Sequence, residues 1–216
     1  MSNHVGDARL DLNRTERIDL PEAVYCAGKT TEQCTQIVEE LLQRSTDTVI
    51  ATRITEQQWP ALAALDPELI GMGIAAWRPR PPTNANVAVV AAGTSDLPIA
   101  DECRVTLEAL GHHVQSITDV GVAGLHRLTT ALPEMAESNV VVALAGMEGA
   151  LPTVLAGLIK QPIVAVPTSV GYGTSFEGIT ALLSMMSSCA PGISVVGIDN
   201  GYGAACASHR ILGLRA

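Results

Sequence analysis

The sequence predicts an α/β protein in which helices cover both faces of a parallel sheet, preceded by a smaller α/β region. Strand-like and helix-like segments alternate along residues 84–216, which is the order that produces parallel strands joined by helices. The strand-like segments are continuous apolar runs, as is typical of strands buried on both faces. The first 80 residues differ, because they hold 8 of the 13 Lys and Arg and 12 of the 22 Asp and Glu.

The N-terminal region is predicted to form a small β-α-β-α unit. Thr30 and Gln33 have the spacing of a capping box, in which side chains satisfy free N–H groups at a helix start. A unit of this size is marginal alone, and we find no catalytic group in it. The proline-rich segment 78–86 is typical of a linker, so the N-terminal domain and linker are placed at 1–83. The predicted strands are 22–28 and 48–53, and the predicted helices are 29–44 and 55–65.

The second domain, residues 84–216, alternates five strands with five helices. Right-handed connections convert this order into a flavodoxin-like three-layer sandwich. The apolar stretch 140–159 is not a membrane span, because Gly146, Glu148 and Pro152 interrupt it and indicate a strand, a turn and a helix. The predicted strands are 87–92, 112–118, 140–145, 162–167 and 192–198, and the predicted helices are 97–110, 124–135, 150–160, 177–188 and 204–213.

Composition excludes several functions. A net charge of -9 with only two lysines argues against nucleic-acid binding, which requires clustered cations. The five cysteines form no CxxC pair and no zinc-type spacing, and no signal peptide is recognisable, which predicts a cytoplasmic protein with reduced thiols and no zinc. Only 16% of the residues are charged, against roughly 25% in an average domain. We therefore expect extensive burial, including contacts in a homo-oligomer.

Ligands of open parallel sheets bind beyond the carboxyl ends of the strands. Each predicted strand is followed by a loop that combines glycine with Asp, Glu or Ser, and in one sheet these loops share one edge. Such loops bind phosphate or carboxylate through free N–H groups, although the same residues also form ordinary turns and caps. The substrate-binding candidates are Gly93, Thr94, Ser95, Asp96, Asp119, Arg127, Gly146, Thr168, Ser169, Gly171, Tyr172, Gly173, Asp199, Asn200 and Gly201.

Three side chains in these loops are candidates for chemistry. Glu148 stands between two glycines in an apolar run, where an unpaired buried carboxylate would be costly, so it is expected to face the site or a metal. His126, beside Arg127, suits a proton shuttle or an anion ligand, although a lone histidine is more often structural. Mg²⁺ prefers oxygen ligands, and the carboxylates of Asp96, Asp119, Glu148 and Asp199 are candidates to hold it, with Asp96 and Glu148 as the predicted pair.

Cys206 lies in the segment DNGYGAAC, near the start of the predicted helix 204–213. The helix dipole stabilises a thiolate at such a position, and His209 follows one turn later. A small cysteine under a helix can equally be an inert part of the core. Chemistry alone leaves both interpretations open.

Five segments in order resemble one family. They are AAGTSDLPIADE, DVGVAGLHRL, AGMEGALPTVLAGL, VPTSVGYG and DNGYGAACA. Together they resemble LarB, a protein family of nickel-pincer cofactor biosynthesis whose catalytic domain is similar to the PurE-type aminoimidazole ribonucleotide carboxylases. The segments ARLDLNR and EAVYCAGKT extend the resemblance over nearly the whole chain.

The resemblance implies a reaction in which nicotinic acid adenine dinucleotide is carboxylated by CO₂ and hydrolysed. The products are pyridinium-3,5-biscarboxylic acid mononucleotide and AMP. It also implies a cysteine that adds to the pyridinium ring, mapped here to Cys206, a Mg²⁺-dependent cleavage step, no flavin, and an octamer built from dimers. The role of His126 is carried over from the PurE position. Tyr172 and Tyr202 are candidates to stack on the ring or the adenine, and either is equally consistent with a packing role.

Two alternatives stay open. One is a PurE-type carboxylase or mutase acting on aminoimidazole ribonucleotide, which needs no cysteine nucleophile. The other is a non-enzymatic nucleotide-binding module that uses the same loops, and a turnover measurement distinguishes it from either enzyme.

Overall fold

The second domain is built on a five-stranded parallel sheet. The computed structural model describes residues 4–5 and 8–214, and its larger sheet has the strand order β11-β10-β9-β7-β8. If the strands are numbered within this domain and the sheet is read from β8 to β11, the order is 2-1-3-4-5, which is the flavodoxin-like arrangement. The predicted fold class and all five predicted strands are confirmed. The strands are β7 (Asn86–Ala91), β8 (His113–Ile117), β9 (Val140–Ala145), β10 (Ile163–Pro167) and β11 (Ile193–Val195).

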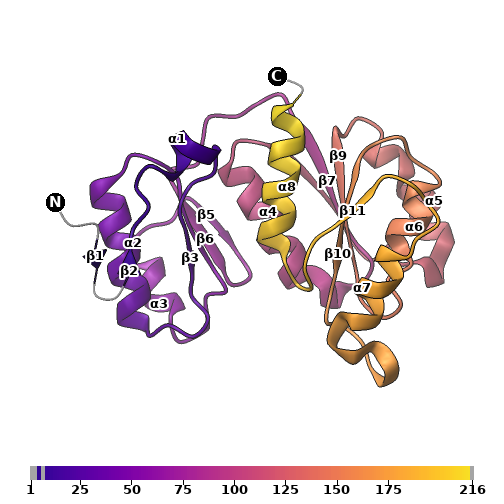
Figure 1. The fold of residues 1–216 in the computed structure, drawn as a ribbon, viewed down its shortest axis with the longest axis horizontal. Coiled ribbons are helices and arrows are strands. Elements are labelled where there is room, and N and C mark those ends of the chain that lie inside the picture. The colour runs from indigo at the N-terminus through magenta and orange to yellow at the C-terminus, as the bar shows by residue number, and fades with distance from the viewer. Residues whose placement is uncertain (1–3, 6–7, 215–216) are drawn as a thin grey trace.

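Helices cover both faces of this sheet (Figure 1). Helices α4 (Leu97–Ala109) and α8 (Gly201–Gly213) pack on one face, where Val89 and Val142 are buried. The other face, with Val90 and Val141, is covered by α5 (Leu125–Ala131), α6 (Leu151–Ala156) and α7 (Ile179–Met186). Burial on both faces explains why the strands are apolar without alternation. Four short 3₁₀ helices complete the domain: η1 (Thr94–Asp96), η2 (Val122–Gly124), η3 (Leu132–Met135) and η4 (Gly173–Gly178).

The apolar stretch 140–159 consists of strand β9, a turn and helix α6, as predicted. Within the described part of the chain, no helix is long and apolar enough to cross a membrane.

The N-terminal region contains a four-stranded mixed sheet in the order β3-β4-β6-β5. The predicted unit is present, and Thr30 and Gln33 form the predicted capping box of α2. The β5–β6 hairpin and α1 were not predicted, because their short segments show no clear periodicity. The elements are β1 (His4–Val5), β2 (Ala8–Arg9), α1 (Arg14–Ile18), β3 (Ala23–Tyr25), α2 (Thr31–Arg44), β4 (Val49–Thr52), α3 (Trp59–Ala63), β5 (Leu69–Gly71) and β6 (Ile74–Trp77).

Helix α4 is shared by the two sheets. On the side away from the parallel sheet, Val105 and Ala109 of α4 form one core with Ile50, Ile74 and Ala76 of the small sheet. Helices α2 and α3 cover the opposite face of the small sheet. Figure 1 therefore shows five successive layers: α2 and α3, the small sheet, α4 and α8, the parallel sheet, and α5 to α7. The small sheet and α1 face the layer formed by α4 and α8. We call this contact region the seam.

Helix α8 begins at Gly201, three residues before the predicted start at residue 204. Asn200 caps it, because its side-chain oxygen accepts a hydrogen bond from the Gly203 N–H at 2.7 Å. A Cβ at Gly201 would lie 2.3 Å from the carbonyl oxygen of Ile99, so only glycine permits this approach to α4. The helix dipole acts most strongly in the first turn. Because α8 starts early, Cys206 lies in its second turn.

Candidate active site at the carboxyl ends of the parallel strands

A cavity of about 350 Å³ lies where the loops after β7, β8 and β9 meet. We call it the strand-end cavity. Strands β7 and β9 are neighbours, but the chain leaves them toward opposite faces of the sheet, which is the switch point where flavodoxin-like folds bind ligands. Eight sequence-predicted residues line this cavity: Gly93, Thr94, Ser95, Asp96, Asp119, Arg127, Gly146 and Glu148.

Asp96 holds two of the loops together. Its carboxylate accepts a hydrogen bond from the Gly93 N–H at 2.9 Å and another from the Thr168 hydroxyl at 2.6 Å. Asp96 is only 2% exposed, and this burial raises its pKa. Thr168 does not line the cavity, so its part in the site is to anchor Asp96.

The loop after β9 has a backbone that few residues could adopt. A Cβ at Gly146 would lie 2.2 Å from the carbonyl oxygen of Val170, so glycine is required there. The next residue, Met147, has a φ of 51° and donates its N–H to the same Val170 oxygen at 2.8 Å. Asp119 after β8 and Asp199 after β11 also have positive φ. Strained backbone of this kind clusters at functional sites.

The cavity wall carries both signs of charge. Arg127 forms an ion pair with Asp119, and both side chains are exposed. Glu148 also lines this cavity, and its side chain is exposed. Such a wall offers a cation for a phosphate or carboxylate, and a carboxylate that can accept a proton.

The described residues do not form a metal site. No group of three or more His, Cys, Asp or Glu side chains among them could hold a metal ion. Both oxygens of Asp96 already accept hydrogen bonds, and Asp119 pairs with Arg127. Glu148 alone keeps its carboxylate free at the cavity, so the predicted pair Asp96 and Glu148 does not fit a protein-held Mg²⁺, and we derive no step through one.

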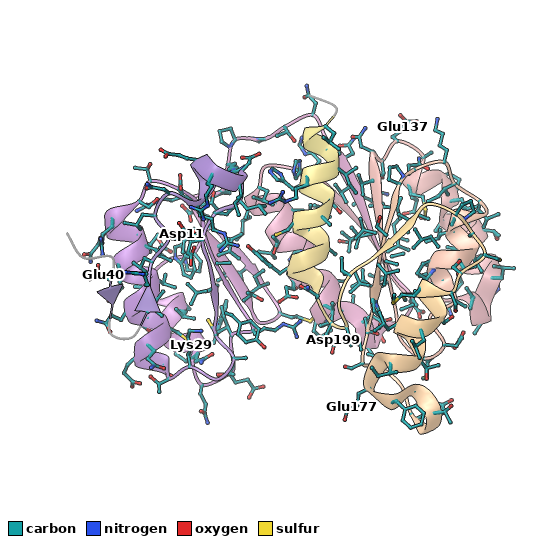
Figure 2. All side chains as sticks on the ribbon, in the orientation of Figure 1. Asp11, Lys29, Glu40, Glu137, Glu177 and Asp199 are labelled. Carbon is teal, nitrogen blue, oxygen red and sulfur yellow. The ribbon has the colours of Figure 1, made fainter. Side chains whose placement is uncertain are left out.

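The loop after β11 is tied both to the site and to the small domain. The Asp199 carboxylate accepts the Ser169 N–H at 2.8 Å. The Asp199 carbonyl accepts a hydrogen bond from Arg53, which also pairs with Glu102 of α4 at 2.9 Å. Figure 2 shows Asp199 in the loop that leads into α8. Arg53 therefore links the small domain to a strand-end loop, a contact that no sequence pattern indicates.

Several predicted residues lie outside the strand-end cavity. His126 is exposed on α5, and Tyr172 is 80% exposed on the loop after β10. Asp199 and Asn200 line a different cavity, at the seam, together with Tyr202. The other predicted substrate-binding residues that do not line the strand-end cavity are Ser169, Gly171, Gly173 and Gly201.

Cys206 is also outside the strand-end cavity. It is partly buried on the second turn of α8, and its neighbours include Tyr202 and Arg14 at the seam. Burial raises the pKa of its thiol, opposite to the lowering expected at a helix N-terminus. Its role as a nucleophile stays a prediction.

His209 belongs to a hydrogen-bonded chain at the seam. Its Nδ1 lies 2.8 Å from His112 Nε2, and its Nε2 lies 3.0 Å from the Asp19 carboxylate. His112 Nδ1 lies 3.1 Å from the Thr83 hydroxyl. Both ring nitrogens of His209 are therefore occupied, so it is not placed to act as a base for Cys206.

Sequence reasoning missed part of the lining of both cavities. Gly121, Met147 and Val170 line the strand-end cavity, and their position directly after predicted strands was the available signal. Arg14 and Tyr25 line the seam cavity, and nothing in their local sequence indicates it.

Comparison with known proteins divides the chain into two matching parts. Residues 86–216 match the AIR carboxylase family, and residues 2–75 match the LarB/PurE-like N-terminal domain. An uncharacterised protein of Methanocaldococcus jannaschii is 37% identical over 214 residues, covering 91% of this chain and 80% of its own. The N5-carboxyaminoimidazole ribonucleotide mutase of that organism is 34% identical over 134 residues, covering 60% of this chain and 80% of its own. The mutase of Pyrococcus horikoshii is 31% identical over 137 residues, covering 60% of this chain and 73% of its own length.

Proposed function

Because this chain belongs to the LarB family, whose second domain is PurE-like, we propose that it carboxylates and hydrolyses nicotinic acid adenine dinucleotide. CO₂ is the second substrate, and the products are pyridinium-3,5-biscarboxylic acid mononucleotide and AMP. The observation that carries the proposal is the joining of a LarB/PurE-like N-terminal domain to an AIR carboxylase domain in one chain. The mutases of M. jannaschii and P. horikoshii match only 60% of this chain.

The reaction requires a ring that is first electron-poor and then electron-rich. A thiolate adds to the pyridinium, forming a C–S bond and a neutral dihydropyridine ring. A ring carbon then attacks CO₂ and forms the new C–C bond. Loss of the proton from that carbon and departure of the thiolate restore the pyridinium, and water cleaves the phosphoanhydride to release AMP.

The strand-end cavity offers groups for these steps. Glu148 is exposed at its wall and is proposed to accept the ring proton. Arg127 is proposed to hold the substrate carboxylate or phosphate, with the backbone N–H groups of loop 93–96. His126 stands beside Arg127 on α5 and is kept as the proposed proton shuttle, reached from outside the cavity.

The thiol step is tested separately, because the single chain does not bring Cys206 to the cavity. Cys206→Ser is predicted to abolish carboxylation. Cys189→Ser is the matched control, since Cys189 alone is exposed among the five cysteines, all of which are described. If Cys189→Ser is inactive and Cys206→Ser is active, the nucleophile is Cys189 and the assignment to Cys206 is wrong.

A homo-oligomer is part of the proposal, and an apolar surface supports it. Phe176, Ile179, Leu183 and Met186 of η4 and α7 are 44% to 69% exposed. Exposed apolar side chains gathered on one element are typical of a contact surface. Light scattering should give a mass that is a multiple of the chain mass of 22.5 kDa, up to an octamer. A monomer at micromolar concentration would contradict it.

The mutase activity of the similar proteins is the second candidate. The decisive experiment supplies the protein with each substrate in turn: the dinucleotide with bicarbonate and Mg²⁺, and N5-carboxyaminoimidazole ribonucleotide alone. Mass spectrometry should find AMP and the dicarboxylated mononucleotide in the first reaction and no rearranged product in the second. The opposite pattern would assign the chain to the mutases.

A further inference from the structure

A second cavity lies at the seam and shares no lining residue with the strand-end cavity. Its volume is about 570 Å³, within the range of roughly 300–1,000 Å³ typical of small-molecule sites. The small domain contributes Arg14, Ala23 and Tyr25 to its wall, and the second domain contributes Asn200 and Tyr202. Both domains are therefore needed to form this seam cavity.

The negative charge of the seam cavity is already neutralised within the protein. Glu102 accepts hydrogen bonds from the Thr52 hydroxyl and from Arg53 Nε at 2.9 Å. Its other oxygen accepts from Arg53 Nη2 and from the Tyr202 N–H, both at 3.2 Å. The Asp199 carboxylate accepts the Ser169 N–H but keeps its charge. The two arginines of the wall, Arg14 and Arg53, balance Glu102 and Asp199, so the lining carries no net negative charge that would repel an anion.

Arg14 offers the cavity a cation. Its side chain is 33% exposed, and its partner Glu22 lies 3.6 Å from Arg14 Nη1, longer than a hydrogen bond. A guanidinium has five N–H donors, so a phosphate in the cavity would find donors at Arg14. The Tyr202 hydroxyl is buried beside the Cys206 thiol and is not open to a ligand.

The rest of the wall suits a flat ring. Ala23 and Ile198 are apolar, and Tyr25 and Tyr202 are aromatic, with Tyr25 57% exposed. Aromatic side chains stack on the faces of heterocycles. The Asn200 oxygen accepts the Gly203 N–H, which leaves its NH₂ group to donate to a ring nitrogen. The cavity thus combines an aromatic wall with a cation.

We propose that the seam cavity binds a nucleoside monophosphate, with its phosphate at Arg14 and its base on the aromatic wall. This inference rests on the proposed function for the identity of the nucleotide, which is then the AMP half of the dinucleotide. The strand-end cavity is the smaller of the two and takes the pyridinium half. The hydrogen bond from the Ser169 N–H to Asp199 joins the loop after β10, whose Val170 lines the strand-end cavity, to the loop after β11, whose Asp199 lines the seam cavity.

Calorimetry on the full chain tests the site without any turnover. AMP should bind once per chain, and adenosine and inorganic phosphate should each bind at least tenfold more weakly. Arg14→Gln and Tyr25→Ala should each weaken AMP binding at least tenfold. Arg17→Gln is the matched control, because Arg17 lies on the same helix, pairs with Asp11 and does not line the cavity. Unfolding temperatures of all variants exclude loss of the fold.

The proposal fails if AMP does not bind, or if Arg14→Gln and Tyr25→Ala, both folded, bind AMP as wild type does. A failure of the proposed function looks different, because AMP then binds and responds to Arg14→Gln while no carboxylated product forms. Carboxylation with the KM for the dinucleotide unchanged in both variants would overturn the seam site alone.

Discussion

The strand-end cavity has exposed charged side chains, whereas Glu102 of the seam cavity is saturated with hydrogen bonds. At the strand ends, Glu148 and the Arg127–Asp119 pair are exposed and open to a ligand. At the seam, Glu102 has four hydrogen-bond donors around its two oxygens. Free charged groups suit chemistry, whereas saturated ones fix geometry. We therefore propose that proton transfer takes place at the strand ends and nucleotide recognition at the seam, and four predictions test this division.

Glu148→Gln should have the largest effect. If Glu148 accepts the ring proton, its amide replacement lowers the carboxylation rate by roughly 10²- to 10⁴-fold. AMP binding at the seam should not change. Glu137→Gln is the matched control, because Glu137 is exposed and lies at the other end of the parallel sheet from Asp199 (Figure 2). A rate in Glu148→Gln equal to that of the control would remove Glu148 from the mechanism.

The seam should weaken in acid, whereas the strand-end loops should not. Burial lowers the pKa of His112 from 6.5 to about 4, so between these values the unfolded chain binds a proton that the folded chain does not. Stability therefore falls as the pH drops from about 6.5 toward 4, by at most about 3 kcal/mol.

Urea unfolding at pH 7 and at pH 5 measures this effect. His112→Gln should flatten the pH dependence, and His113→Gln, an exposed neighbour, should leave it unchanged. Equal slopes in the wild type and His112→Gln would show that the seam does not sense pH through this residue.

Asp96→Asn should affect the strand-end loops without reaching the seam. The amide can accept only one of the two hydrogen bonds, so either the Gly93 N–H or the Thr168 hydroxyl loses its acceptor. An unsatisfied buried group costs about 1–3 kcal/mol. Denaturant unfolding should show this loss, and AMP binding should persist. A variant as stable as wild type would contradict the anchoring role of Asp96.

Arg53→Lys should have the smallest effect and should link the two cavities. Lysine keeps the charge beside Glu102 but cannot form the forked contact of the guanidinium with Glu102 and Asp199. We expect the KM for the dinucleotide to rise by a few-fold with kcat nearly unchanged. An unchanged KM would show that the loop before α8 needs no support from the small domain.

The second domain was predictable because its strands are buried on both faces and its helices follow in strict alternation. The strand-end cavity followed from that order, since parallel strands end at one edge. The seam was not predictable, because the contacts of Arg53 with Glu102 and of His112 with His209 join residues 49 and 97 positions apart with no local pattern. The position of Cys206 was not predictable for the same reason. Its segment begins at the strand ends with Asp199, but Cys206 lies in the second turn of α8, where its side chain faces the seam.

The most direct test of carboxylation at the strand-end cavity follows the carbon atom of labelled bicarbonate into the product. The protein is incubated with nicotinic acid adenine dinucleotide, ¹³C-bicarbonate and Mg²⁺, and the products are separated and weighed by mass spectrometry. The account predicts AMP and a dicarboxylated pyridinium mononucleotide carrying one ¹³C, and loss of both label and product in Glu148→Gln. Unlabelled nicotinic acid mononucleotide with AMP, or no reaction at all, would contradict carboxylation at the strand-end cavity.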